Sequence, residues 1–325
     1  MKKRSVILLA LLMVLALVAV GCGDAAGTQA VKLGIVQIVE HPALDASRTG
    51  FLDALNDNGF AEGDNLEVDY KNAQGDQSTL KTISQKFVND QVDLVLAIAT
   101  PSAITMASET QSTPILITAV TDPVAANLVK SNENPGTNVT GTTDMTPVKA
   151  QLEMLKQLSP DVEKVGVIYN SSEINSEVQV NIAKEAAAEL GLEIVEATVT
   201  TSAEVMQVSQ SLVGQVDAIY VPTDNLVASS IASVVTVAEE HDIPLVVGES
   251  GMVNGGALAT IGIDYYKLGY QTGEMAVRVI NGEKPAEMAI ESQKELDIVV
   301  NLGAAERMGV EIPQEIIDQA KEVIE

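Results

Sequence analysis

The chain is poor in the residues that build cross-links, metal centres and aromatic surfaces. Its 325 residues include no tryptophan, three phenylalanines, two histidines and one cysteine. One cysteine cannot form a disulfide within the chain. Together with only His41 and His241, it also does not supply the ligands of a zinc, haem or iron–sulfur centre. We therefore expect a fold without disulfides, metals or cofactors.

Basic residues are scarce as well. The chain has 19 lysines and arginines against 45 aspartates and glutamates, which gives a formal net charge of −26. Such a surface repels phosphate backbones, so we expect no nucleic-acid partner. Apolar residues, in contrast, make up 46% of the chain. This length and composition suit two domains of about 150 residues, each with its own core.

The N-terminus has the pattern of an export signal. Lys2-Lys-Arg4 precedes an uncharged apolar run from Val6 to Val20. At about 15 residues, this run is short for a membrane span of about 20. It leads into Ala19-Val-Gly-Cys22, which resembles the lipobox of bacterial lipoproteins, with Ala19 at a position where leucine is usual.

This resemblance implies that residues 1–21 are a signal peptide and that Cys22 carries a lipid after cleavage. Residues 22–30 are mostly small and polar, which favours a lipidated flexible tether. Because the signal takes its three basic residues with it, the mature formal charge becomes −29. The alternative is an uncleaved anchor with an incidental cysteine. Both interpretations place the mature protein outside the cytoplasm, and the lipobox anchors it to the outer face of the bacterial cell membrane.

The rest of the chain alternates between strand and helix patterns, and it does so twice. Lys32–Ile38 is short, apolar and β-rich, as in a buried parallel strand, and Ser47–Asn58 has helical spacing and stops at Gly59. Lys164-Val-Gly-Val matches Lys32-Leu-Gly-Ile, and Gly191 matches Gly59, both at an offset of 132 residues. Chance similarity between two α/β domains remains an alternative. We predict an α/β protein with two similar Rossmann-like lobes, each built on a parallel sheet with helices on both faces.

The two lobes are expected to be joined by about three crossings that act as hinges. The predicted crossings are Asn138–Asp144, Ala257–Asp264 and Leu296–Asn301, and a last helix is expected from Pro313 to the end. The N-terminal lobe then takes residues 31–140 and about 265–292, and the C-terminal lobe takes 141–264 and about 293–325. Two rigid lobes on three hinge strands can close over a cleft.

Ligands of open parallel sheets bind beyond the carboxyl ends of the strands, and polar residues gather at these ends here. The candidate ligand-binding residues are Thr100, Ser102, Asp122, Asp144, Tyr169, Asn170, Ser171, Asn175, Asp224, Asn225, Glu249 and Asp264. Hydroxyls and helix-start amides such as those at Thr100 suit a carboxylate, whereas the acidic residues suit an ammonium group. The set therefore indicates a small zwitterion. Thr100, Asp122 and Asp224 are explained equally well as helix N-caps.

Other site chemistries find less support. There is no glycine-rich phosphate loop, no basic residue among the candidates, and little aromatic surface for stacking a sugar. Gly248-Glu-Ser-Gly251 is followed by Met252 where a nucleophile elbow needs glycine. A hydrolase would need the fold to pair His41 with Ser102 or Ser250. We expect no enzyme, with an extracellular hydrolase as the alternative.

Six motifs carry a resemblance to a known family. They are Gly34–Asp45, Ala119–Ala125, Asn138–Asp144, Tyr169–Ser176, Val221–Asn225 and Gly256–Gly273. Together they resemble the ABC-transporter substrate-binding proteins associated with aromatic amino-acid uptake. The resemblance implies the type I periplasmic-binding-protein fold, capture of tryptophan, phenylalanine or tyrosine, and a permease and an ATPase as partners.

We therefore expect an extracytoplasmic solute-binding lipoprotein, acting as a monomer, that captures an amino-acid-like ligand between its lobes. Alternatives within the binding class are a nucleoside, a branched-chain amino acid or another small polar solute. A sensory lobe that reports ligand state to a membrane receptor is a further alternative.

Overall fold

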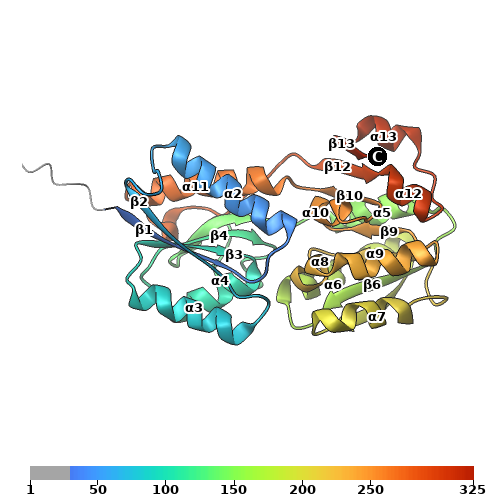
Figure 1. Ribbon diagram of the computed structural model, residues 1–325, viewed down its shortest axis with the longest axis horizontal. Coiled ribbons are helices and arrows are strands. Elements are labelled where there is room, and N and C mark those ends of the chain that lie inside the picture. The colour runs from blue at the N-terminus through green and yellow to red at the C-terminus, as the bar shows by residue number, and fades with distance from the viewer. Residues whose placement is uncertain (1–29) are drawn as a thin grey trace, which may run out of the picture.

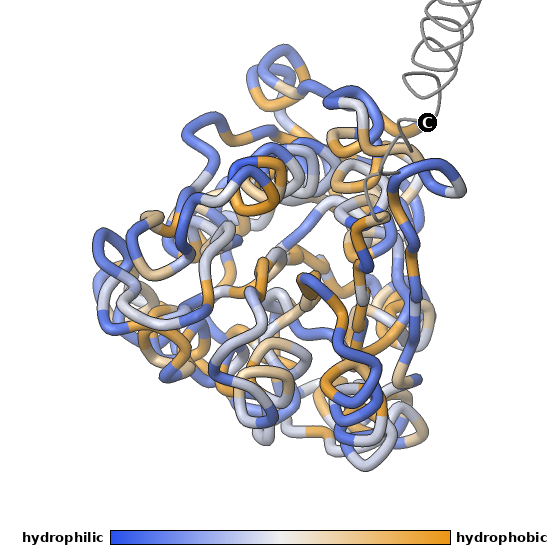
Figure 2. The backbone as a smooth tube through the Cα atoms, turned by 90° about the vertical axis from the view of Figure 1, so that its left-hand side faces the viewer, coloured by the Kyte–Doolittle hydropathy of each residue, from blue (hydrophilic) through white to orange (hydrophobic). Residues whose placement is uncertain are grey.

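The computed structural model describes residues 30–325, so Cys22, the predicted signal peptide and nearly all of the predicted tether lie outside the described residues. Two α/β lobes lie side by side, and each has a central sheet with helices on both faces (Figure 1). Seen from the end of the first lobe, hydrophobic residues gather along the interior segments and hydrophilic ones along the outer loops (Figure 2). Among residues 30–325, no helix has the length and apolarity needed to cross a membrane.

The first lobe has a six-stranded sheet in the order β11-β5-β4-β3-β1-β2, and every pair of neighbours is parallel. Its strands are β1 Val31–Gln37, β2 Leu66–Asn72, β3 Leu94–Ile98, β4 Ile115–Val120, β5 Val139–Thr143 and β11 Glu291–Ser292. Its helices are α2 Pro42–Asp57, α3 Gln77–Asn89, α4 Thr100–Glu109, α11 Tyr265–Ile280 and the 3₁₀ turn η2 Pro285–Glu287. Since helices cover both faces, β3 and β4 are buried at every residue, which explains their unbroken apolar sequence.

The second lobe has a seven-stranded sheet in the order β13-β12-β10-β9-β8-β6-β7, in which only β10 and β12 pair antiparallel. Its strands are β6 Lys164–Asn170, β7 Glu193–Val199, β8 Ala218–Val221, β9 Leu245–Val247, β10 Ala259–Gly262, β12 Asp297–Asn301 and β13 Glu322–Ile324. Its helical segments are α5 Val148–Leu158, α6 Ile174–Leu190, η1 Ser202–Glu204, α7 Val205–Ser211, α8 Asn225–Ser229, α9 Ile231–Glu240, α10 Ser250–Asn254, α12 Leu302–Arg307 and α13 Gln314–Gln319.

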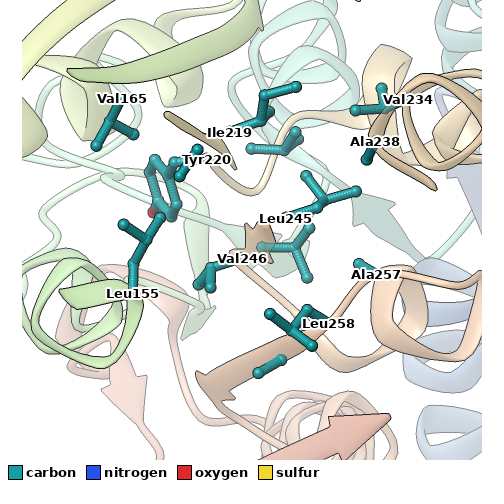
Figure 3. Packing of buried hydrophobic residues seen from close by; sticks show 14 of the residues in the cluster. Leu155, Val165, Ile219, Tyr220, Val234, Ala238, Leu245, Val246, Ala257 and Leu258 are labelled. Atoms are coloured by element: carbon teal, nitrogen blue, oxygen red, sulfur yellow. The ribbon is translucent and has the colours of Figure 1, made fainter. Parts of the chain in front are cut away.

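The core of the second lobe is built around Tyr220, whose ring packs beside Leu155 and Val165 (Figure 3). Its hydroxyl is buried and donates to Oε1 of Gln151 at 2.6 Å. The amide of Gln151 in turn donates to the carbonyl oxygen of Ile261 at 2.7 Å. Because the hydroxyl of Tyr220 and the side-chain amide of Gln151 both have hydrogen-bond partners, their burial in the core costs little.

The chain passes between the lobes three times, at 144–147, 263–264 and 293–296. The strands next to these crossings each belong to a single sheet. Strands β5 and β11 lie in the first sheet, and β10 and β12 lie in the second. Gln293 joins two crossings, because its amide donates to the backbone oxygen of Asp264 at 2.6 Å and its Oε1 accepts from the backbone of Asp264 at 3.2 Å. The predicted two-lobe α/β fold with mostly parallel sheets is confirmed.

The C-terminus differs from the predicted helix. Helix α13 ends at Gln319, and Glu322–Ile324 instead pairs with β12 in parallel. Ala320 is already extended, and the Lys321 backbone donates to the carbonyl of Ile298 at 2.9 Å. The β-branched Val323 and Ile324 favour a strand, and a sheet edge at β12 offers the hydrogen bonds for it.

Helices α2 and α11 connect the binding region to the hinge in one rigid pair (Figure 1). Their backbones touch, because a Cβ at Gly269 would lie 1.9 Å from the carbonyl oxygen of Ser47 and one at Gly50 would lie 2.0 Å from that of Tyr266. Since α2 begins next to His41 and α11 begins directly after the second crossing, this closely packed pair links one end of the cleft to the hinge.

Candidate functional site

The lobes meet around a small cavity of about 10 Å³ at the carboxyl ends of both sheets. The first lobe and the adjoining crossings contribute His41, Leu44, Ala119, Thr121, Asp144 and Tyr265. The second lobe contributes Asn175, Thr223, Asp224, Asn225, Ala228 and Glu249. This is the position where ligands bind in open parallel α/β sheets.

Four buried carboxylates surround this cavity. Asp144, Asp224 and Glu249 line it, and Glu173 lies directly behind it. Across residues 30–325, no lysine or arginine forms an ion pair with any of the four. Burial raises the pKa of Glu249 and of Glu173 to about 7, and it also raises the pKa of Asp144 and of Asp224. The junction is therefore acidic and lacks a cation of its own.

The second lobe holds Asp224 firmly. Its Oδ2 accepts from the backbone of Asn170 at 2.7 Å and from the hydroxyl of Ser176 at 2.6 Å, and its Oδ1 accepts from the backbone of Val227 at 2.8 Å. Asp224 is the N-cap of α8, as the sequence predicts. These bonds come from its own lobe, so they persist whether or not the lobes are closed.

Glu173 is held in the same way by three asparagine side chains. Its Oε1 accepts from Nδ2 of Asn170 at 3.3 Å, and its Oε2 accepts from Nδ2 of Asn175 at 3.1 Å and of Asn225 at 2.5 Å. The second carboxamide atom of Asn175, Oδ1, is buried without a partner. Glu173 thus fixes the orientation of two residues that line the cavity.

The first lobe presents polar atoms that have no partner. Neither ring nitrogen of His41 is hydrogen-bonded, although Asn225 of the other lobe lies beside it. Burial lowers the pKa of His41 to about 4, so the imidazole is neutral. Asp144 accepts from the hydroxyl of Tyr265 at 2.7 Å through Oδ2, but its Oδ1 is unpartnered. Such atoms are rare in native interiors and call for an explanation.

The start of α4 has the same character. The hydroxyls of Thr100 and Ser102 are buried and unpartnered. The N-cap is Ala99 instead of Thr100, with φ of 75° and ψ of 155°, a conformation that L-residues rarely adopt. Ala119, next to it on β4, also has a positive φ, of 55°. Two alanines with positive φ therefore lie at adjacent strand ends on this edge of the sheet, and Ala119 lines the cavity.

The cavity brings together five of the residues predicted from the sequence, namely Asp144, Asn175, Asp224, Asn225 and Glu249. Asn170 lies behind it and bonds to both Asp224 and Glu173. Thr100 and Ser102 are buried in the first turn of α4 and do not line the cavity.

The remaining predicted residues lie elsewhere. Asp122 caps a turn by accepting from the backbone of Val124 and Ala125, and Ser171 is exposed. The hydroxyl of Tyr169 donates to Glu196 on β7 at 2.6 Å. Asp264 caps α11 and faces a separate groove at the hinge.

The list of candidate ligand-binding residues omits several residues of the site. His41, Thr121 and Thr223 follow strands, so their positions were a usable signal. Glu173, Leu44, Ala119, Ala228 and Tyr265 carry no such mark, because their place at the cavity depends on how the two lobes meet. His41 forms no hydrogen bond to Ser102 or to Ser250, so the pairing that a hydrolase needs is not made.

Comparison with known proteins identifies the family. Residues 32–324 match the family model described as ABC transporter substrate binding protein. The chain is 48% identical over 270 residues to the tyrosine-binding protein of Clostridioides difficile strain R20291, covering 83% of this chain and 78% of that protein.

Two solved structures are informative about the arrangement of the lobes. The ABC domain from Streptococcus pneumoniae in complex with L-Trp has 38% identity, covers 91% of this chain and 100% of its own, and superposes with a TM-score of 0.88. The ligand-free, open structure of a substrate-binding protein with adhesive properties from Clostridium difficile has 51% identity, covers 90% of this chain and 99% of its own, and reaches a TM-score of only 0.69. Because the more similar sequence superposes less well, the lobes here are arranged as in the L-Trp complex and not as in the open structure.

These matches cover nearly all of the described residues, and they confirm the family that the sequence motifs resemble. The chain belongs to the ABC transporter substrate-binding protein family and has the type I periplasmic-binding-protein fold.

Proposed function

We propose that this protein is a lipid-anchored solute-binding protein of an ABC importer that captures an aromatic amino acid between its lobes. The observation that carries the proposal is the acidic, cation-free junction with unpartnered buried atoms from both lobes. The tyrosine-binding relative and the L-Trp complex support an aromatic amino acid as the ligand.

The ammonium group of the ligand fits the acceptors of the junction. Asp144, at a crossing, and Asn175, in the second lobe, both line the cavity, and Oδ1 of each has no donor. An ammonium group offers three donors and no acceptor. Its charge also compensates for the buried carboxylates, which are costly without a cation. Among residues 30–325, no group of histidines, cysteines, aspartates and glutamates is arranged to hold a metal ion. These acceptor oxygens therefore favour an ammonium group over a metal ion.

The carboxylate of the ligand fits the start of α4. Its first turn provides free backbone N–H groups and the positive end of the helix dipole, and the hydroxyls of Thr100 and Ser102 are unpartnered donors there. Ala99 adjoins the cleft edge, because its backbone donates to the carbonyl of Thr118 at 3.0 Å, next to the cavity residue Ala119.

Ligand capture follows from these contacts without a covalent step. A ligand that bonds to both lobes binds the closed arrangement more tightly than the open one, so it shifts the equilibrium between them. The closed monomer then delivers the ligand to a permease driven by an ATPase. No cofactor takes part.

A thermal-shift screen tests the identity of the ligand. The mature protein is screened against the twenty amino acids and common nucleosides, and saturation at 100 times Kd adds about 2.7 kcal/mol to its stability. We expect the largest rise in Tm with L-tyrosine, L-tryptophan or L-phenylalanine and none with 3-(4-hydroxyphenyl)propionate, which lacks the ammonium group. A shift with nucleosides alone would overturn the ligand proposal.

The anchor is tested separately at Cys22, which the resemblance to a lipobox proposes as the lipidation site on the outer face of the cell membrane. Cys22→Ala should move the protein from the membrane fraction to the soluble fraction. A variant that stays with the membrane would contradict lipidation while leaving the ligand proposal intact.

A further inference from the structure

A second and much larger pocket lies between the lobes. Its volume is about 330 Å³, and both lobes line it. Ile38, Val39 and Leu226 give it apolar walls, and the amides of Gln74 and Gln77 stand at its rim together with Ser229. We call the cavity of about 10 Å³ the inner cavity and this space the outer pocket.

The two spaces share one lining residue. Asn225 lines both the inner cavity and the outer pocket. It is held in place by Glu173, whose Oε2 accepts from Nδ2 of Asn225 at 2.5 Å, and Glu173 itself lines the outer pocket. The same oxygen accepts from Asn175 of the inner cavity at 3.1 Å. The wall between the two spaces is therefore a fixed hydrogen-bonded group and not a loose loop.

The volumes decide which part of an amino acid goes where. The inner cavity has room for about one water molecule, and an aromatic ring does not fit in it. The outer pocket falls within the range of about 300–1,000 Å³ that is usual for small-molecule sites. The hinge groove around Asp264 is also large, at about 410 Å³, but it shares no lining residue with the inner cavity.

We propose that the outer pocket is the side-chain subsite of the ligand, and that Asn225, positioned by Glu173, determines which side chains reach it from the inner cavity. This inference rests on the proposed function. The ammonium group stays with the acceptors of the inner cavity, and the aromatic side chain passes beside Asn225 to lie against Ile38, Val39 and Leu226. The amides of Gln74 and Gln77 then offer partners to a phenol hydroxyl or an indole N–H.

A pair of matched variants tests the subsite. Ser229→Phe fills the outer pocket from α8, where Ser229 is exposed, is the last residue of its helix, and donates to the carbonyl of Leu226 at 2.7 Å. Ser211 is the matched control, because it is exposed at the end of α7 and donates to the carbonyl of Val208 at 2.7 Å, but it does not line the pocket. Because the chain has no tryptophan, the protein adds no tryptophan emission, and the change in L-Trp emission during a titration reports binding.

We expect Ser229→Phe to weaken L-Trp binding at least tenfold and Ser211→Phe to leave it within twofold, with both unliganded proteins melting like the wild type. Leu226→Ala should weaken L-Trp, L-Tyr and L-Phe together by removing an apolar wall. Asn225→Ala should change the ratio of L-Trp to L-Phe affinity at least threefold. Wild-type binding that survives both Ser229→Phe and Leu226→Ala would overturn the subsite and leave the proposed function standing. A wild-type protein that binds no aromatic amino acid would overturn the proposed function itself.

Discussion

The two lobes bring different faces to the cavity between them. In the second lobe, the carboxylates of Asp224 and Glu173 accept from several donors of their own lobe, and the buried atoms without a partner are Oδ1 of Asn175 and Oγ1 of Thr223. The first lobe arrives with unpartnered atoms on His41, Thr100 and Ser102, and with one free oxygen on Asp144. The carboxylates of the second lobe are therefore preformed, whereas the first lobe has more buried polar atoms that still need a partner.

This difference has an energetic consequence. A buried polar atom without a partner costs about 1–3 kcal/mol, and the first lobe has more such atoms than the second. A ligand that supplies the missing donors and acceptors removes this cost, which links binding to closure.

The largest expected effect comes from removing the carboxylate of Asp224 in the second lobe. Asp224→Ala leaves the backbone donors of Asn170 and Val227 and the hydroxyl of Ser176 without an acceptor. We expect the free energy of unfolding to fall by about 3 kcal/mol, measured by urea denaturation of the unliganded protein. If Asp224→Ala unfolds like the wild type, the second lobe is not preformed as described.

The same class of residue should behave differently in the first lobe. Asp144→Asn keeps an acceptor for the hydroxyl of Tyr265 but removes the charge that faces the ligand ammonium. We expect little change in the stability of the unliganded protein and a loss of affinity of about 100-fold, or about 2.7 kcal/mol, measured by calorimetry. Asp122→Asn, at a turn outside the cavity, is the matched control and should bind normally. Equal loss of stability in Asp144→Asn and Asp224→Ala would remove the distinction between the lobes.

Sequence patterns predict the fold better than the site, and the reason is the range of the interactions involved. The repeated segments that begin at Lys32 and Lys164 are short apolar runs. Such runs predict buried parallel strands covered by helices, and both segments form such strands. The strand-end residues Asp144, Asp224 and Glu249 follow from the same local logic, because parallel strands bring their carboxyl ends to one edge.

The residues that were missed depend on distant partners. Glu173 is buried through amides from Asn170, Asn175 and Asn225, of which Asn225 is 52 positions away. His41 is buried by a lobe whose residues come more than a hundred positions later. Strand β13 exists because it pairs with β12, which its own sequence does not reveal.

The pH dependence of stability tests the acidic junction and should be the third-largest effect. Burial raises the pKa of Glu249 and of Glu173 to about 7, against about 4.3 in the unfolded chain. The native state therefore binds more protons, so this contribution is fully present below pH 4.3 and is lost as the pH rises through about 7. Between pH 6.5 and 8.5 we expect a loss of about 1 kcal/mol for each group, seen as a lower Tm at pH 8.5.

Glu249→Gln should flatten that slope by roughly half, whereas Glu240→Gln, at an exposed position on α9, should leave it unchanged. His41 works in the opposite direction, because burial lowers its pKa to about 4 and its contribution is lost as the pH falls from 6.5. Between pH 6.5 and 8.5 the unfolded-state His41 loses its remaining half proton, which adds back only about 0.4 kcal/mol against the loss of about 2 kcal/mol from the two carboxylates. A Tm that rises from pH 6.5 to 8.5 would mean that the carboxylates are not buried without cations.

The smallest effect is expected at the hinge, which belongs to neither face. Nζ of Lys321, in the second lobe, lies 2.5 Å from Oδ2 of Asp297 and 3.8 Å from Oδ2 of Asp264 in the crossing to the first lobe. All three side chains are partly exposed, so Lys321→Met should lower the free energy of unfolding by only about 0.5 kcal/mol, an effect that fades at high salt. Lys284→Met, which breaks an exposed pair with Glu287 inside the first lobe, is the control. Because Lys321 bridges a crossing and Lys284 does not, only Lys321→Met of these two variants should change the fraction of closed molecules measured by small-angle scattering without ligand. If Lys284→Met changes that fraction equally, the lobes respond to surface charge in general and not to the hinge.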